Sequence, residues 1–406
     1  MKVKIEKLDH FGRGITHIND KICFIKDALP EEVVDIEIIN ENKKYIEAIT
    51  KKVKEKSPYR IKSQCKYSNK CGGCVFNHLL FEEENKYKKE KVQEIISRFG
   101  ELDKKLVKEI KYNEEYNYRN KIILHGIGNK LGFYEEKTHS IIPIDKCLLI
   151  SPNMNKVIKV LNSINERIEE VLIRCNNDDS MIMVELEGKV KDIDKLKEVC
   201  DVLIYNGLIL SDKDELINKI GNKKYYVSYS SFFQVNRFLT KNLYNEVLKE
   251  VKKKNPNKVL DLYTGTGTIG IYVSEYAKKI IGIDSNGSNI KNANKNKELN
   301  NVKNIEFICD KVENRINEFN NIDLIIVDPP RAGLDPKTKD YLKEIKPDTI
   351  IYVSCDPVTL ARDLKELKDI YNIKSIKPFN MFPRTYHCES IAVLDKKKTK
   401  KENENE

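Results

Sequence analysis

The chain lacks any long hydrophobic run. None of its 406 residues belongs to a stretch of about 18 consecutive apolar side chains, so we expect no transmembrane helix and no membrane partner. The first residues, MKVKIEKLDHFGRG, alternate polar and apolar side chains and lack the apolar core of a secretory signal. These two absences predict a cytoplasmic location.

Positive charge and cysteine are both abundant. The formal net charge of +10 suits a polyanionic partner such as nucleic acid, although a lysine-rich proteome would give the same charge. A cytosolic chain keeps its ten cysteines reduced, so clustered cysteines indicate metal binding or catalysis rather than disulfides. No obligate protein partner is evident from the sequence.

The chain divides into three parts and a tail. Several short strands separated by turns over residues 1–56 predict a small β-barrel, a fold that often binds oligonucleotides. Residues 57–235 predict a central α+β domain with a helix over 78–99. From 236 to 394, apolar strands alternate with helical segments, which predicts a Rossmann-like, parallel, doubly wound sheet. The polar, low-complexity residues 395–406 predict a disordered tail.

A glycine-rich loop follows the first strand of the C-terminal part. In DLYTGTGTIG, Gly265 and Gly267 allow a tight turn and a close approach of a ligand to the backbone. Asp284 ends the next strand, 19 residues after Gly265, which is the spacing of an acidic residue that holds ribose hydroxyls. The loop lacks the Lys-Ser/Thr pair of a P-loop. It resembles the S-adenosylmethionine loop of class I methyltransferases more than the dinucleotide loop of a dehydrogenase, which is the alternative.

Two further strand ends carry candidate chemistry. Asp328-Pro329-Pro330 follows DLIIV, and Cys355 follows TIIYVS at the same edge of the predicted sheet, where ligands of open α/β sheets bind. Cys355 also precedes a predicted helix, whose N-terminus is expected to favour the thiolate. The other isolated cysteines lack this context, which is typical of packing residues.

A thiolate at this place suits methylation of a pyrimidine carbon. Its addition to C6 makes C5 nucleophilic enough to accept a methyl group, and a base must then remove the C5 proton. The segment NMFPRTYHCES offers His387 and Glu389 as that base, and chemistry alone does not choose between them. Cys388 is a second candidate thiol.

A cysteine cluster lies in the central part. Cys65, Cys71 and Cys74 have the spacing C-x5-C-x2-C, and Cys147 is a candidate fourth ligand. Four thiolates suit zinc or an iron–sulfur cluster, but zinc sites usually use two short C-x2-4-C pairs. The spacing also differs from the C-x3-C-x2-C of radical S-adenosylmethionine enzymes.

The motifs YSSFFQVN, DLYTGTGTIG, DPPRAGLD, SCDPVTLARD and FPRTYHCES together resemble the RNA uracil-5-methyltransferases that modify ribosomal or transfer RNA. The resemblance covers nearly the whole chain and implies that the first 55 residues form an RNA-binding TRAM barrel. It implies that Cys355 is the nucleophile and Glu389 the general base. It further implies a [4Fe–4S] cluster on Cys65, Cys71, Cys74 and Cys147. Because cluster-bearing relatives often act on 23S ribosomal RNA, that RNA is the favoured substrate and transfer RNA is possible.

The same resemblance implies a set of residues that contact cofactor or substrate. Asp310 corresponds to the position flanking the adenine of S-adenosylmethionine, and Thr268 stands where relatives often have Asn. The remaining members of the set are Gln234, Tyr263, Gly265, Gly267, Asp284 and Asp328.

Two alternative functions can be compared with the sequence. RNA cytosine-C5 methyltransferases usually carry a second cysteine in the D/N-P-P motif, which Asp328-Pro329-Pro330-Arg331 lacks. A non-catalytic RNA-binding iron–sulfur protein would not need the intact set of Cys355, Glu389 and the glycine loop. An enzyme of either kind must use a loop nucleotide or flip its base out of a helix.

Overall fold

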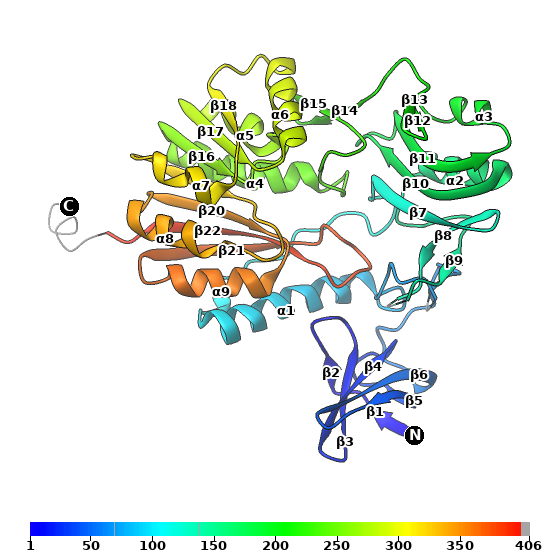
Figure 1. Cartoon of the computed structure of the whole chain (residues 1–406). Coiled ribbons are helices and arrows are strands. Elements are labelled where there is room, and N and C mark those ends of the chain that lie inside the picture. The colour runs from blue at the N-terminus through cyan, green and yellow to red at the C-terminus, as the bar shows by residue number, and fades with distance from the viewer. Residues whose placement is uncertain (69, 137, 399–406) are drawn as a thin grey trace.

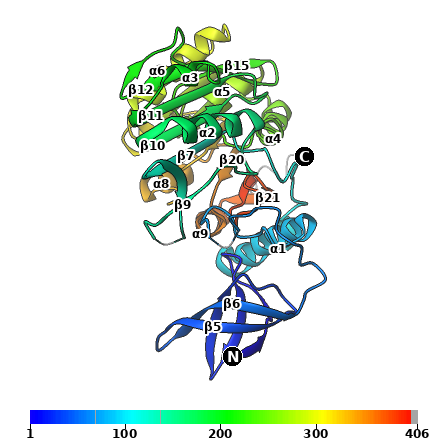
Figure 2. The same ribbon diagram turned by 90° about the vertical axis from the view of Figure 1, so that its right-hand side faces the viewer.

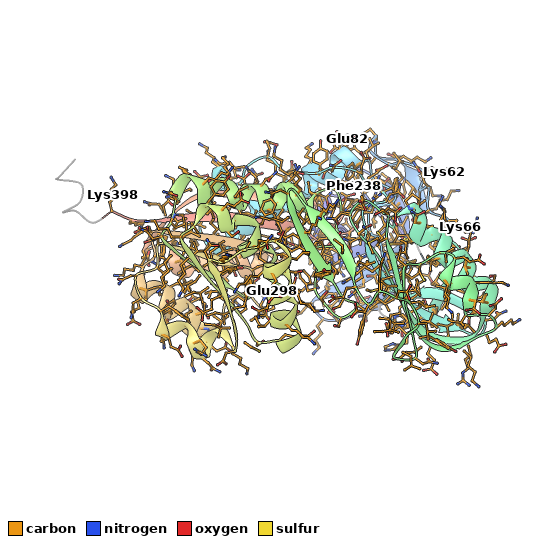
Figure 3. The ribbon with its side chains drawn as sticks, turned by 90° about the horizontal axis from the view of Figure 1, so that it is seen from above. Lys62, Lys66, Glu82, Phe238, Glu298 and Lys398 are labelled. Atoms are coloured by element: carbon orange, nitrogen blue, oxygen red, sulfur yellow. The ribbon has the colours of Figure 1, made fainter. Side chains whose placement is uncertain are left out.

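The computed structural model describes residues 1–68, 70–136 and 138–398, which form three large sheets and one hairpin. In both Figure 1 and Figure 2 the N-terminal sheet lies below the other two. Charged side chains project all around the molecule, with Lys62 and Lys66 toward one end and Lys398 at the other (Figure 3). Within the described ranges, every helix is too short or too polar to cross a membrane.

The N-terminal sheet has six strands in the order β1-β5-β6-β4-β3-β2. Alternate side chains of its strands point inward, and Cys23, Ile25, Val34 and Ile46 form a small separate core. Cys23 is therefore a packing residue. The strands are β1 (Lys2–Lys4), β2 (Lys7–Leu8), β3 (Gly14–Ile18), β4 (Lys21–Lys26), β5 (Val33–Glu41) and β6 (Tyr45–Glu55).

The central sheet has seven strands in the order β13-β12-β11-β10-β7-β8-β9. Helix α2 (Pro152–Ile164) buries Met154, Val157, Ile158 and Leu161 against the sheet. The strands are β7 (Lys121–Ile127), β8 (Lys130–Tyr134), β9 (Ile141–Pro143), β10 (Asn165–Cys175), β11 (Ile182–Val190), β12 (Val202–Tyr205) and β13 (Leu208–Ile209), with the short helix α3 (Asp194–Lys197) between β11 and β12.

The C-terminal sheet has the order β18-β17-β16-β19-β20-β22-β21. Its first five strands in the chain are parallel, as the alternating pattern predicts, and both faces are covered by helices. The last two strands differ from the prediction, because β21 and β22 form an antiparallel pair and β22 is antiparallel to β20. The strands are β16 (Lys258–Leu262), β17 (Lys279–Asp284), β18 (Ile305–Cys309), β19 (Leu324–Val327), β20 (Thr349–Ser354), β21 (Tyr371–Phe379) and β22 (Glu389–Lys396).

Successive residues of these buried strands serve opposite faces of the sheet. Val259 packs in one apolar cluster with helix α4, while Leu260 packs in the other with α8 and α9. An apolar stripe along α4 is buried and consists of Leu239, Leu243, Val247 and Val251. The helices are α4 (Thr240–Lys254), α5 (Thr268–Val273), α6 (Gly287–Leu299), α7 (Val312–Arg315), α8 (Pro336–Ile345) and α9 (Pro357–Leu367), with single turns η2 (Ser274–Tyr276) and η3 (Ile316–Glu318).

Two segments that precede residue 236 pack on this C-terminal sheet. Helix α1 (Phe81–Gly100) lies beside α9 (Figure 1) and buries Val92, Ile95 and Ile96 in the same apolar cluster as β19 and β20. Burying these three side chains contributes roughly 5–8 kcal/mol before the entropy cost. The turn η1 (Lys104–Leu106) follows, and the hairpin β14 (Leu216–Ile220) and β15 (Lys223–Val227) packs in the opposite cluster. The domain boundary between residues 235 and 236 stays a prediction. The contacts of α1 and of the β14–β15 hairpin with the C-terminal sheet join residues on both sides of that boundary.

The polar tail begins later than its composition suggests. Asp395 and Lys396 belong to β22, where Asp395 accepts hydrogen bonds from Thr349 and Lys254. The strand extends this far because its partner β20 begins at Thr349 and continues the register. Residues 397–398 follow the strand, and residues 399–406 of the predicted tail lie outside the described residues.

Candidate active site

The glycine loop and the Asp328 loop meet where the strand order of the C-terminal sheet reverses. Strands β16 and β19 are neighbours in the sheet. After β16 the chain adds β17 and β18 on one side of β16, and it then returns to add β19 and β20 on the other side. Loops on either side of such a reversal diverge and leave a crevice at the carboxyl ends of the strands. The structure therefore brings the sequence-predicted loops 263–267 and 328–330 to one crevice.

The glycine loop has backbone angles that glycine favours. The φ angles are +56° at Gly265 and +75° at Gly267, and a Cβ on Gly267 would lie 2.5 Å from Cζ of Phe307. Gly265 donates its backbone N–H to Asp284 Oδ2 at 3.0 Å. Asp284 thus holds the loop in place. It also ends β17, 19 residues after Gly265, which is the spacing expected of an acid that binds ribose hydroxyls.

Asp261, which sequence reasoning missed, lies beneath this loop. Its side chain is 1% exposed, and Oδ2 accepts hydrogen bonds from Thr264 Oγ1 at 2.5 Å and Gly270 N at 3.1 Å. Burial raises the pKa of this carboxyl to about 6. An acidic residue inside the otherwise apolar strand KVLDL was the available signal.

Three of the remaining predicted cofactor residues, Tyr263, Thr268 and Asp310, lie after the ends of strands of this sheet. Thr268 begins α5, and its hydroxyl is 2.7 Å from that of Tyr244. Tyr263 donates its hydroxyl to Asp335 at 3.1 Å. Asp310 follows β18, and its backbone N–H donates to Asp284 O at 3.1 Å, so the two acids end adjacent strands. Gln234 is buried, and its backbone carbonyl accepts a hydrogen bond from the Asn120 side chain at 3.0 Å.

Cys355 and Glu389 come together from neighbouring strands. The β20–β22 register pairs Ser354 with Ser390, so Cys355 follows the last position of one strand and Glu389 begins the other at the opposed position. Glu389 is 3% exposed and Cys355 is half-buried. Burial and the nearby Asp328 raise the pKa of Glu389 well above its usual value, while burial and Asp261 raise that of Asp328 to about 7.

The environment of the Cys355 thiol differs from the expected one. Its pKa is raised to about 12, first by burial and then by Glu389 and Asp328, whereas a helix N-terminus was expected to favour the thiolate. The N-terminus of α9 is capped by Asp356, which accepts the N–H groups of Val358 and Thr359. Arg331, from the Asp328 loop, acts in the opposite direction and lowers the pKa of the thiol.

The other candidates in the NMFPRTYHCES segment have different environments. His387 lies 3.4 Å from an Arg331 nitrogen, and burial together with Arg331 lowers its pKa to about 4. Cys388 is buried in the apolar cluster beside β21, where its Sγ lies 3.6 Å from Phe379 O. Cys388 therefore points into the core, away from Cys355.

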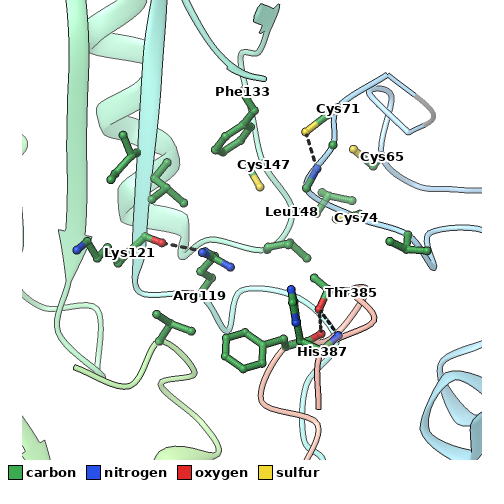
Figure 4. A pocket seen from close by; sticks show the side chains of 18 of the residues that line it. Cys65, Cys71, Cys74, Arg119, Lys121, Phe133, Cys147, Leu148, Thr385 and His387 are labelled. Carbon is green, nitrogen blue, oxygen red and sulfur yellow. Dashed lines mark hydrogen bonds between the residues drawn. The ribbon is translucent and has the colours of Figure 1, made fainter. Parts of the chain in front are cut away.

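The four predicted metal-binding cysteines line one cavity of about 660 Å³ (Figure 4). Gly73 donates its backbone N–H to Cys71 Sγ at 3.4 Å. Across the described residues, no three His, Cys, Asp or Glu side chains converge on one ion position. The other cysteines of this region, Cys175 and Cys200, pack in the core of the central sheet instead.

The same cavity reaches the active-site segments. Its lining includes basic and aromatic side chains, and Phe232 among them is 60% exposed. Cys355, Asp328 and Glu389 are not part of the lining, but Arg331 and His387 are. The cysteine cluster thus borders the approach to the crevice. The lining residues that bear on this point are Arg119, Lys121, Phe232, Arg331, Tyr386 and His387.

Comparisons with known proteins agree with this architecture. Residues 212–397 match the tRNA (uracil-5-)-methyltransferase family and residues 1–50 match the TRAM domain. Uncharacterized RNA methyltransferases of Aquifex aeolicus and Caldanaerobacter subterraneus are 34% and 33% identical, covering 98% and 97% of this chain and 99% and 98% of their own. The crystal structure of Pyrococcus abyssi tRNA (uracil-54, C5)-methyltransferase with S-adenosyl-L-homocysteine superposes with a TM-score of 0.80 at 26% identity, covering 97% of this chain and all of that one.

The N-terminal sheet is thus a TRAM domain, and the C-terminal sheet is a methyltransferase fold. The chain belongs to the family of S-adenosylmethionine-dependent RNA uracil-5-methyltransferases.

Proposed function

We propose that the protein methylates C5 of a specific uridine in RNA through a covalent bond between Cys355 and C6 of the base. The observation that carries this proposal is the opposed placement of Cys355 and Glu389 beside Asp328, at the crevice that also holds the glycine loop. Cofactor, nucleophile and base would then meet at one edge of one sheet.

The residues have distinct roles in this reaction. The Cys355 thiolate adds to C6, the electron pair moves to C5 and the carbonyl, and C5 becomes nucleophilic. S-adenosylmethionine supplies the methyl group that C5 accepts. Glu389 then takes the C5 proton, the C5=C6 double bond forms again and the C6–S bond breaks, which frees Cys355.

The surroundings support Glu389 over His387 as the base. Glu389 is the carboxylate that acts most strongly on the Cys355 thiol, whereas His387 lies on the cavity side beside Arg331. Burial and Asp328 raise the pKa of Glu389, which makes its carboxylate a stronger proton acceptor. Arg331, which favours the charged forms of both Cys355 and Glu389, would assist both steps.

The residues around the glycine loop would hold S-adenosylmethionine. Gly265 and Gly267 leave room for a ligand beside the backbone, and Asp284 and Asp310 end the two strands next to β16. Asp284 would hold the ribose hydroxyls and Asp310 would flank the adenine. Asp328, Tyr263, Thr268 and Gln234 complete the set that the resemblance implies.

We also propose that Cys65, Cys71, Cys74 and Cys147 bind a [4Fe–4S] cluster. The donor set fits, because four thiols line one cavity and a four-iron cluster binds one thiolate at each iron. The cluster would join the segment after the TRAM domain to the central sheet.

The favoured substrate is 23S ribosomal RNA, because of the four cysteines. Transfer RNA is the second candidate, because the Pyrococcus abyssi structure that matches along the whole chain is a tRNA (uracil-54, C5)-methyltransferase. Mapping 5-methyluridine in total RNA from a strain that lacks the gene tests both. Loss at one 23S position identifies the first, loss in tRNA identifies the second, and unchanged 5-methyluridine everywhere refutes the enzymatic proposal.

A further inference from the structure

The loop that leads to Glu389 is held by side chains from distant parts of the chain. Residues 380–388 contain no helix or strand, and Glu389 begins β22 directly after them. Four buried or half-buried donors hold its backbone carbonyls. They are Asn236 to Met381 O at 3.1 Å, Lys88 to Phe382 O at 3.0 Å, Tyr118 to Pro383 O at 3.0 Å and Lys91 to Tyr386 O at 2.8 Å.

Arg384 is the most constrained residue of this loop. It is 1% exposed, and its φ of +69° lies in the left-handed region that a long L side chain rarely adopts. Its guanidinium donates to Phe76 O at 2.9 Å, to Leu79 O at 2.6 Å and to the Glu115 carboxylate. A planar fork is required to bind these three acceptors together.

The backbone of Arg384 is held as firmly as its side chain. Its N–H donates to Glu84 Oε1 of helix α1 at 2.9 Å. Its carbonyl accepts the N–H groups of Val75 at 2.7 Å and Phe76 at 3.0 Å, which directly follow Cys74. The loop is therefore attached at Arg384 both to α1 and to the cysteine segment.

Cys355 has a support of its own. It follows β20, whose partners are β19 and β22, and precedes Asp356, the cap of α9. Among the described residues, the side chains of Arg384 and Tyr118 form no hydrogen bond with β19, β20 or Asp356. A displaced loop would consequently move Glu389 more than Cys355.

We propose that Arg384 is a positioning residue that, together with Tyr118, fixes the loop carrying Glu389 and so serves removal of the C5 proton. This inference rests on the proposed function. With the loop displaced, Cys355 still adds to C6 and C5 still accepts the methyl group. The C5–H bond then breaks slowly, so the C6–S bond persists and the methylated RNA stays attached to the enzyme.

The test compares three variants of the full-length protein. Arg384→Lys keeps the charge but loses the fork. Tyr118→Phe removes one buried hydroxyl that donates to the loop carbonyl of Pro383. Tyr371→Phe is the matched control, since it removes an equally buried hydroxyl that donates at 3.0 Å to Leu342 O of α8, away from the loop.

Each variant is given 23S rRNA and tRNA from the deletion strain, and covalent RNA–protein complexes are measured on denaturing gels during turnover. We expect such complexes to accumulate with Arg384→Lys and Tyr118→Phe, and product release to slow roughly 100-fold and roughly tenfold. Methyl transfer in a single turnover should stay unchanged. The Tyr371→Phe protein should behave as wild type in both measurements.

Two results would overturn the inference. One is equal behaviour of Tyr118→Phe and Tyr371→Phe, and the other is a single-turnover methyl transfer that slows as much as release. Tyr118→Phe decides the matter if Arg384→Lys does not fold. Failure of the proposed function looks different, because the wild-type enzyme would then form no covalent complex with 23S rRNA and tRNA transcripts containing 5-fluorouridine.

Discussion

Cys355 and Glu389 occupy opposed positions where β20 ends and β22 begins, and the carboxyl group raises the pKa of the thiol. The pairing of two strands thus brings the two residues together, and the loop 380–388, which is held at Arg384, leads directly into Glu389. The first two predictions separate the tasks of these two residues.

We expect Cys355→Ala to form no covalent complex with RNA that contains 5-fluorouridine at the target. Fluorine at C5 cannot leave as a proton, so an active nucleophile is trapped. Cys388→Ala is the control, because that thiol is buried against Phe379 O and should not be needed for trapping. Denaturing gels measure the complex. A complex that survives in Cys355→Ala would move the nucleophile elsewhere.

Replacing Glu389 with Gln should leave one round of methylation intact and slow the release of product by roughly 100-fold or more. The amide keeps the shape of the side chain but cannot accept the C5 proton. Rapid-quench single-turnover and steady-state rates measured on the same RNA distinguish the two steps. Normal steady-state turnover of this variant would remove Glu389 from the role of base.

The pH dependence should follow the raised pKa values of the site. Below pH 7 the Asp328 carboxyl is largely protonated, and the Cys355 thiol, with its pKa of about 12, is neutral in the free enzyme. Raising the pH from 6 to 8 increases both ionised forms, so kcat/KM should rise roughly tenfold or more. The thermal stability of the protein over the same range is the control for unfolding. A flat or falling profile would contradict these ionisations.

The two loop glycines should differ in their tolerance of a side chain. Gly265→Ala should cost about 1–2 kcal/mol in the free energy of unfolding, because of its φ of +56° alone. Gly267→Ala should cost about 3 kcal/mol or more, since its Cβ would also lie 2.5 Å from the Phe307 ring. Urea denaturation of the two proteins checks the difference. Equal losses would mean that the Phe307 contact is easily relieved.

The cysteine cluster can be tested without any measurement of activity. Cys74→Ser should lose iron and acid-labile sulfide from protein purified without oxygen, because one of four ligands is gone. Cys200→Ser should keep both, since that thiol lies 3.0 Å from Leu196 O in another part of the central domain. Stoichiometric zinc in the wild-type protein in place of iron would refute the cluster.

The sequence was informative where one local pattern decides the structure. The strands of the C-terminal sheet, helix α2 and the loops around Gly265 and Asp328 follow from apolar runs and turn residues. The antiparallel edge of β21 and β22 could not be predicted, because an apolar run does not reveal the direction of its neighbour. Nor could the packing of α1 be predicted, because its Lys88 and Glu84 are charged residues that the fold buries as an ion pair at 2.8 Å.

The same limit applies to the site. Cys355 and Glu389 were both found, but the raised thiol pKa was not, because it depends on the through-space proximity of Glu389 and Asp328. Asp261 was missed because its environment becomes unusual only when the strand is buried and the glycine loop folds over it. Arg384 carries no motif signal of its own, and its partners lie about 300 residues earlier in the chain.

The position of α1 also constrains how the chain matures during synthesis. Its apolar face leaves the ribosome well before the strands that cover it, since Val92 and Ile95 pack with β19 and β20. Domains usually fold in order of their synthesis, but this helix must wait for nearly the whole protein. Until then the apolar face of α1 is exposed to solvent, so we expect nascent chains that stop before β20 to bind chaperones. A fragment that begins after α1 would, for the same reason, leave a complementary apolar face of the C-terminal sheet uncovered.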